Sequence, residues 1–225
     1  MKFQLDIDIK PLPIKIRHHQ RIMLAGSCFT EHMSRFLSRY KFQTMQNSHG
    51  ILFNPWSVCK ALEDVVNCKM YTANDLFFLN EYWHSWLHHS DFSSMDVEIS
   101  LQSINQSIQE HHDFLKTTDY LLLTLGSSFV YRNLTLGSFV SNNHRAPAND
   151  FEKILLSIQD MTDTLTHIQL KIKAFNPKVQ FIYTLSPVRH IRDGVIENNR
   201  SKARLLEVIH ALPNSYYFPA YELVM

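Results

Sequence analysis

The sequence of 225 residues has neither a long apolar run nor an excess of charge of one sign. No stretch approaches the ~18 uninterrupted apolar residues that a membrane-spanning helix needs. Charged residues also interrupt residues 1–10, where a signal peptide would carry its apolar core. Lysine and arginine number 22 against 21 for aspartate and glutamate, a formal net charge of +1, so no general field draws the chain to nucleic acid or to an anionic membrane. We therefore expect no nucleic-acid partner and no membrane span.

Cysteine is scarce as well. Cys28, Cys59 and Cys68 form neither an even set nor a Cys-x-x-Cys pair, which is typical of reduced thiols in a cytoplasmic protein. Internal repeats, low-complexity tracts and linkers are also missing, and the length fits one α/β domain over residues 1–225. We expect a single cytoplasmic domain.

Five short apolar runs alternate with segments of helical period, which predicts parallel strands linked by crossover helices. Strands are expected at residues 21–25, 42–45, 120–125, 179–185 and 216–221, and helices at 28–40, 55–66, 97–115, 151–175 and 201–212. The apolar face of the first helix is expected at Phe29, Met33, Phe36, Leu37 and Tyr40. Asn54 and Pro55 are typical of a helix start. An aromatic and histidine-rich segment at about 70–95 is predicted to be a hairpin or a lid insertion.

A serine directly follows the first predicted strand. Open α/β sheets bind ligands at the carboxyl ends of their strands, and there the chain carries Gly26 and then Ser27. Backbone amides at a helix N-terminus can support an oxyanion, and a glycine permits a sharp turn before it. On the local pattern alone, capping of the helix is the more common role for Ser27. Cys28 is a further alternative, because a thiol at a helix N-terminus can itself be a nucleophile.

The stretch Gly26–Thr30 resembles the block that gives the GSCFA family its name, with Thr30 in place of the usual alanine. Further segments that resemble blocks of this family are Asn47–Pro55, Trp83–Ser93, Leu123–Tyr131, Asn143–Arg145, Ser186–Gly194 and Ser201–Ala203. They occur in the family's order between about residue 20 and residue 222, which is far more specific than one short motif. The chain therefore resembles a GSCFA protein over most of its length.

The GSCFA family is similar to the SGNH, or GDSL-like, hydrolases. The resemblance implies a flavodoxin-like three-layer α/β sandwich with about five parallel strands. It implies a serine esterase or acyltransferase with an acyl-enzyme on Ser27, acting on a small-molecule or glycan ester without a cofactor. It also implies that Gly50 and Gly126 line the oxyanion or substrate-binding site. The usual asparagine is missing two residues after Gly126, so Asn143 in the next loop takes that role.

The general base is not evident. SGNH proteins carry an Asp-x-x-His after the fifth strand, and none follows Tyr221, so the resemblance predicts that the C-terminal part of the family domain is absent. His190 and Asp193, after the fourth strand, are the best substitutes. Their order is reversed, and a role in substrate binding or in a solvated loop is the more common one. Without a base, the chain would be a non-catalytic binding or scaffolding domain that keeps the pocket.

Histidines in the aromatic segment raise a metal alternative. His84 and His88 are four residues apart, and His89 and Asp91 lie beside them, a spacing that can bind zinc on a helix. Clusters of aromatic residues and histidines more often line a pocket or a core. We therefore expect no metal.

Overall fold

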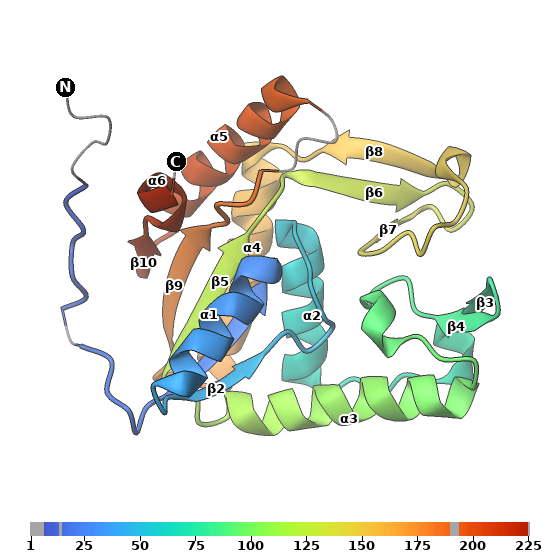
Figure 1. Cartoon of the computed structure of the whole chain (residues 1–225), viewed down its shortest axis with the longest axis horizontal. Coiled ribbons are helices and arrows are strands. Elements are labelled where there is room, and N and C mark those ends of the chain that lie inside the picture. Colours follow the sequence, from blue (N-terminus) through green and yellow to red (C-terminus); the bar gives the residue numbers. More distant parts are fainter. Residues whose placement is uncertain (1–6, 14, 190–193, 225) are drawn as a thin grey trace.

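A five-stranded parallel sheet forms the centre of the computed structural model, which describes residues 7–13, 15–189 and 194–224 (Figure 1). Its strands are β1 (Arg21–Gly26), β2 (Gln43–Gln46), β5 (Tyr120–Leu125), β9 (Gln180–Leu185) and β10 (Ser215–Phe218). All pairs are parallel, in the order β2-β1-β5-β9-β10. Numbered along the chain, this is the flavodoxin-like order 2-1-3-4-5. The predicted fold class is confirmed.

Helices cover both faces of this sheet. They are α1 (Cys28–Arg39), α2 (Pro55–Asn67), α3 (Val97–Leu115), α4 (Ile158–Phe175), α5 (Val195–Ala211) and the short α6 (Ala220–Val224). The main core packs α2, α4 and α5 on one face, against strand residues such as Leu121 and Leu123. On the other face, Met33 and Leu37 of α1 pack on Ile22 and Leu24. Because β5 is buried on both sides, its sequence is almost continuously apolar, as predicted.

The start of α2 follows the predicted chemistry. Asn54 is the N-cap, and its Oδ1 accepts a hydrogen bond from the Ser57 amide at 2.9 Å. Pro55 occupies the first turn, where its missing N–H costs nothing. This start fixes the direction in which the chain leaves the carboxyl edge of the sheet.

Two small antiparallel sheets lie at one side of the molecule (Figure 1). The first is the hairpin of β3 (Phe77–Leu79) and β4 (Tyr82–His84), inside the aromatic segment. The second joins β6 (Phe129–Asn133), β7 (Ser138–Val140) and β8 (Phe151–Leu155), with β6 in the middle. The Ser141 amide donates to the Trp86 carbonyl at 2.8 Å, so the loops of the two sheets are in contact.

Several predicted boundaries are wrong. Residues 151–155 form β8 instead of the first turns of a helix, because they pair with β6, and α4 begins only after the Ser157 N-cap. The last predicted strand ends at Phe218, before Pro219, and residues 220–221 belong to α6. Helix α5 begins six residues before the predicted start, with exposed residues that carry no apolar period.

Part of the predicted apolar face of α1 is also wrong. Phe36 and Tyr40 are 52% and 59% exposed, and their rings pack against each other with centroids 4.8 Å apart. The buried face is therefore narrower than the five-residue stripe. Within the described ranges, no helix is both long and apolar enough to cross a bilayer.

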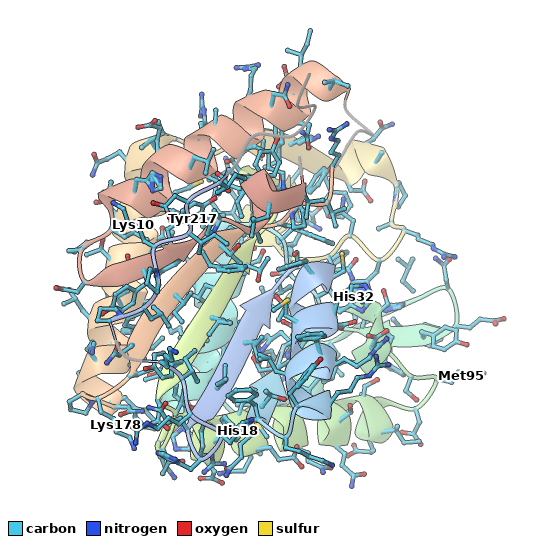
Figure 2. The ribbon with its side chains drawn as sticks, turned by 60° about the vertical axis from the view of Figure 1, so that its left-hand side comes forward. Lys10, His18, His32, Met95, Lys178 and Tyr217 are labelled. Carbon is cyan, nitrogen blue, oxygen red and sulfur yellow. The ribbon has the colours of Figure 1, made fainter. Side chains whose placement is uncertain are left out.

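The α1 face of the sheet is covered in part by an extended N-terminal segment, of which residues 7–13, 15 and 16 are described. A cavity of about 750 Å³ lies beneath it, lined mainly by apolar side chains of this segment, of α1 and of the strands. Lys10 of the segment and Tyr217 of β10 both line the cavity and lie near each other in Figure 2. This layer of the sandwich is therefore less tightly filled than the helical layer opposite.

Candidate functional site

Ser27 is the single residue between β1 and α1. The preceding Gly26 has a φ of +135°, and a Cβ atom on it would lie 2.1 Å from the carbonyl oxygen of Thr124 in β5. Only glycine lets the two strands approach this closely in that conformation. The Ser27 amide donates to the same carbonyl at 3.1 Å. Ser27 thus stands on a sharp turn between β1 and α1. In the sheet this turn lies next to the boundary of β1 and β5, where the order of the strands reverses, and open α/β folds bind ligands at such a point.

The hydroxyl group of Ser27 is buried and unpartnered. The residue is 0% exposed, and although it is the N-cap of α1, its side chain makes no capping hydrogen bond. Oγ has no hydrogen-bond partner in the described part of the chain. Ser27 therefore occupies the N-cap position, as the capping alternative has it, but its hydroxyl does not cap the helix. Buried hydroxyls are normally hydrogen-bonded, so the Ser27 hydroxyl is left able to take a partner from outside the described residues.

The residues expected at the oxyanion site have other contacts. The Gly50 amide donates to the Asn47 carbonyl at 2.8 Å, and the Gly126 amide donates to the Phe53 carbonyl at 2.7 Å. Asn143 lies in the loop after β7, where its carbonyl accepts from the Ala146 amide at 2.8 Å. None of the described hydrogen bonds joins these three residues to Ser27.

Asn47 contacts Gly26, the residue before Ser27, and the sequence did not single it out as a site residue. Its Oδ1 accepts a hydrogen bond from the Gly26 amide at 3.0 Å, which fixes the orientation of the side-chain amide. Its Nδ2 is buried and has no partner among the described residues. A buried N–H donor held one residue from a serine hydroxyl has the chemistry that an oxyanion requires. The available signal was its place after the second strand, at the same edge of the sheet as Ser27.

A buried polar network fixes the loop after β2. His49 Nε2 lies 3.3 Å from Asp64 Oδ2, and Ser48 Oγ lies 3.0 Å from His49 Nδ1. Because Nε2 faces a carboxylate, it carries the proton, and Nδ1 accepts from the Ser48 hydroxyl. Asp64 also accepts from the Tyr71 hydroxyl at 2.7 Å and from Lys60 Nζ at 2.9 Å. Burial alone would raise the pKa of Asp64, but the hydrogen bonds from His49, Tyr71 and Lys60 outweigh it and lower this pKa to about 2.

Histidines pack the same loop against the aromatic segment. His49 stacks on His88 with ring centroids 4.0 Å apart, and His88 Nδ1 lies 2.9 Å from Ser85 Oγ. Burial lowers the pKa of His49 and lowers that of His88 further, so both rings are neutral at pH 7. A Cβ on Gly50 would lie 2.3 Å from the Cβ of His89, so the segment closes tightly over the loop that carries Asn47.

Two further predictions concern the general base and a zinc site. His190 and Asp193 lie outside the described residues. His84 contacts Ser93 Oγ at 2.7 Å and the Leu79 carbonyl at 3.0 Å. Across the described ranges, no set of three histidine, cysteine or acidic residues is placed to hold a metal ion. Nothing in the geometry favours the zinc alternative.

Comparison with known proteins gives one family match. The model of the GSCFA family matches residues 21–225. No curated protein matches the chain. Among solved structures, the chain is similar to an acetyl xylan esterase from the rumen bacterium Butyrivibrio proteoclasticus, with 9% identity and a TM-score of 0.37. The match covers 93% of this chain and 57% of the esterase, so the chain spans little more than half the length of that protein.

Proposed function

Because the chain belongs to the GSCFA family, we propose that it carries an SGNH-type serine hydrolase site centred on Ser27. In this proposal the Ser27 oxygen attacks the carbonyl carbon of an ester and the alcohol leaves with the proton of the serine, which gives an acyl-enzyme. The acyl group then passes to water in an esterase, or to another hydroxyl in an acyltransferase. The substrate is a small-molecule or glycan ester.

One observation carries the proposal: the Ser27 hydroxyl is buried without a partner at the N-terminus of α1. The unpartnered Nδ2 of Asn47 supports it, because this group can stabilise the negative oxygen of a tetrahedral intermediate. In the proposal, Asn47 supplies the oxyanion contact that the resemblance assigned to Gly50, Gly126 and Asn143. The three cysteines are free thiols, which supports the further proposal of a cytoplasmic location.

Labelling by a fluorophosphonate tests the nucleophile. The reagent should phosphonylate the wild-type protein at Ser27, and Ser27→Ala should abolish the labelling because the attacking oxygen is gone. Mass spectrometry of the labelled peptide identifies the residue. Ser48→Ala is the matched control: Ser48 is also a buried serine at the carboxyl edge of the sheet, but its hydroxyl is bonded to His49, so labelling should persist.

A second candidate function is a binding or scaffolding domain without catalysis. It is favoured by the full burial of Ser27 and by the amides of Gly50 and Gly126, which already have acceptors. Equal labelling of the wild type and Ser27→Ala, or no labelling of either, would support this function and contradict the hydrolase. Inactivation of an esterase activity by iodoacetamide that disappears in Cys28→Ser would instead assign the reaction to the thiol.

A further inference from the structure

The segment that carries Asn47, residues 47–52, is bonded to β1 at three points. The Asn47 amide donates to the Leu24 carbonyl at 2.9 Å, and the Leu52 amide donates to the Gly26 carbonyl at 3.0 Å. The third bond joins Asn47 Oδ1 to the Gly26 amide. Asn47 has a φ of +53°, a left-handed conformation that residues other than glycine seldom adopt unless the surrounding structure holds them there. The position of its free Nδ2 therefore depends on what holds this segment, which we call the Asn47 loop.

Two consecutive histidines of the aromatic segment also hold the Asn47 loop. The His88 ring stacks on the ring of His49, with centroids 4.0 Å apart and planes within 9° of parallel. The His89 amide donates to the His49 carbonyl at 2.8 Å. The next residue of the loop, Gly50, meets the His89 side chain so closely that a Cβ atom on it would lie 2.3 Å from the His89 Cβ. His88 and His89 thus fix both a ring and the backbone of the loop.

The His88 ring has its own anchors. It is 0% exposed, its Nδ1 lies 2.9 Å from Ser85 Oγ, and the ring of Tyr71 meets it edge-on with centroids 4.9 Å apart. The Tyr71 hydroxyl also donates to Asp64, the carboxylate of α2 that holds His49. The two stacked rings are therefore held by the same surroundings, so a shift of the aromatic segment would move the Asn47 loop with it.

We propose that His88 and His89 are positioning residues for the Asn47 amide: they hold the Asn47 loop so that Nδ2 can donate to the oxygen of the acyl group that Ser27 attacks. The inference rests on the proposed function, because Asn47 needs a fixed position only if it stabilises an oxyanion. It gives the aromatic segment a role that is neither a lid nor a zinc site. Neither histidine transfers a proton in this role, so the general base of the reaction is a separate group.

The test is the rate at which a fluorophosphonate labels Ser27, because the phosphonyl oxygen also gains negative charge as the serine attacks. Gly50→Ala should slow labelling by about 100-fold, the effect of losing one oxyanion donor, because the new Cβ forces the loop away from His89. Adding His89→Gly removes the atom that the alanine meets, so the double variant should recover most of the rate. Gly137→Ala is the matched control: its φ is also positive, but its Cβ meets nothing within 4 Å, so the rate should stay unchanged.

A comparison with Asn47→Ala distinguishes positioning from a merely structural role. Asn47→Ala should itself slow labelling by about 100-fold. If the two histidines act through the Asn47 amide, Gly50→Ala should slow this variant little further, because the amide that it displaces is already gone. Effects of the two substitutions that multiply would contradict the inference.

Melting curves establish which variants are folded. Should Gly50→Ala not fold, His88→Leu replaces it, because an apolar side chain removes the ring stack without adding volume; the same loss of rate and the same dependence on Asn47 are expected. Labelling of Ser27 at the full rate in either folded variant would overturn the inference and leave the proposed function intact. Labelling of Ser27→Ala like the wild type would instead contradict the proposed function, and this inference with it.

Discussion

Gly26 is the residue on which the turn before Ser27 depends. We predict that Gly26→Ala lowers the free energy of unfolding by about 3 kcal/mol or more, because the new Cβ would lie 2.1 Å from the Thr124 carbonyl oxygen at a φ of +135°. Urea denaturation measures this change. Gly137→Ala is the control: its φ is also positive, at +66°, but nothing lies within 4 Å of the added Cβ, so about 1 kcal/mol is expected. Equal costs for the two variants would show that the close approach of β1 and β5 does not matter.

Ser27 and Asn47 show how much of the candidate site could be predicted from the sequence for single residues. The position of Ser27 after the first strand could be predicted, since a local pattern of strand, glycine and serine indicates it. Whether its hydroxyl caps α1 could not be predicted, because capping depends on a side-chain rotamer. Asn47 was missed because its contact with Gly26 spans 21 positions of sequence. That Nδ2 of Asn47 has no partner among the described residues follows only from the three-dimensional positions of Asn47 and Gly26.

Folding buries several of the described histidines of this chain. Burial lowers the pKa of four of them: His49, His88, His111 and His144. For His144 it falls to about 4. The unfolded chain binds protons at these residues below about pH 6.5, where the folded chain binds fewer because the pKa values of its buried histidines are lowered. The stability that neutral burial provides is therefore fully present well above pH 6.5, where the unfolded histidines are neutral too, and it decreases as the pH falls through 6.5.

We predict that the free energy of unfolding decreases between about pH 7.5 and about pH 5.5, by up to about 1.4 kcal/mol per pH unit for each neutral histidine. Urea denaturation at several pH values measures the slope. His144→Gln should reduce the slope by about one proton. His18→Gln should leave it unchanged, because His18, labelled in Figure 2, is exposed. A free energy of unfolding that is constant over this range would contradict the prediction.

Elements with strong local signals were predictable, and those that depend on distant pairing were not. α2, α3 and β5 have caps or unbroken apolar runs, and their observed bounds agree with the predicted ones to within about a residue. Residues 151–155 were predicted as helix because Phe151 and Leu155 continue the apolar spacing of α4. These residues form a strand because they pair antiparallel with β6. Such a pairing with a distant segment cannot be predicted from the local spacing of apolar residues.

At the scale of the whole molecule, the alternation of strands and helices was enough to predict a parallel sheet, and the family resemblance was enough to predict its flavodoxin-like class. The strand order places the ends of β1, β5 and β9 next to one another. The amides of Ser27 and Ser186 both donate to carbonyl groups at the end of β5 for that reason, although 159 positions separate the two serines in sequence. The sequence alone did not indicate that Lys202 of α5 is buried, with its Nζ donating to the Ser186 carbonyl, because a lysine within a helix is usually exposed.

The two outer layers of the sandwich differ in how they are held. Three helices pack on one face, whereas residues 7–13 on the other lie over a cavity, and within the described chain no backbone hydrogen bond ties them to a strand. Local opening should therefore begin on that side. Measured by amide hydrogen exchange, residues 7–13 should exchange early, and β5 should exchange only when the whole molecule unfolds. Residues 7–13 and β5 would then exchange at clearly different rates. Similar exchange rates in these two regions would contradict the prediction.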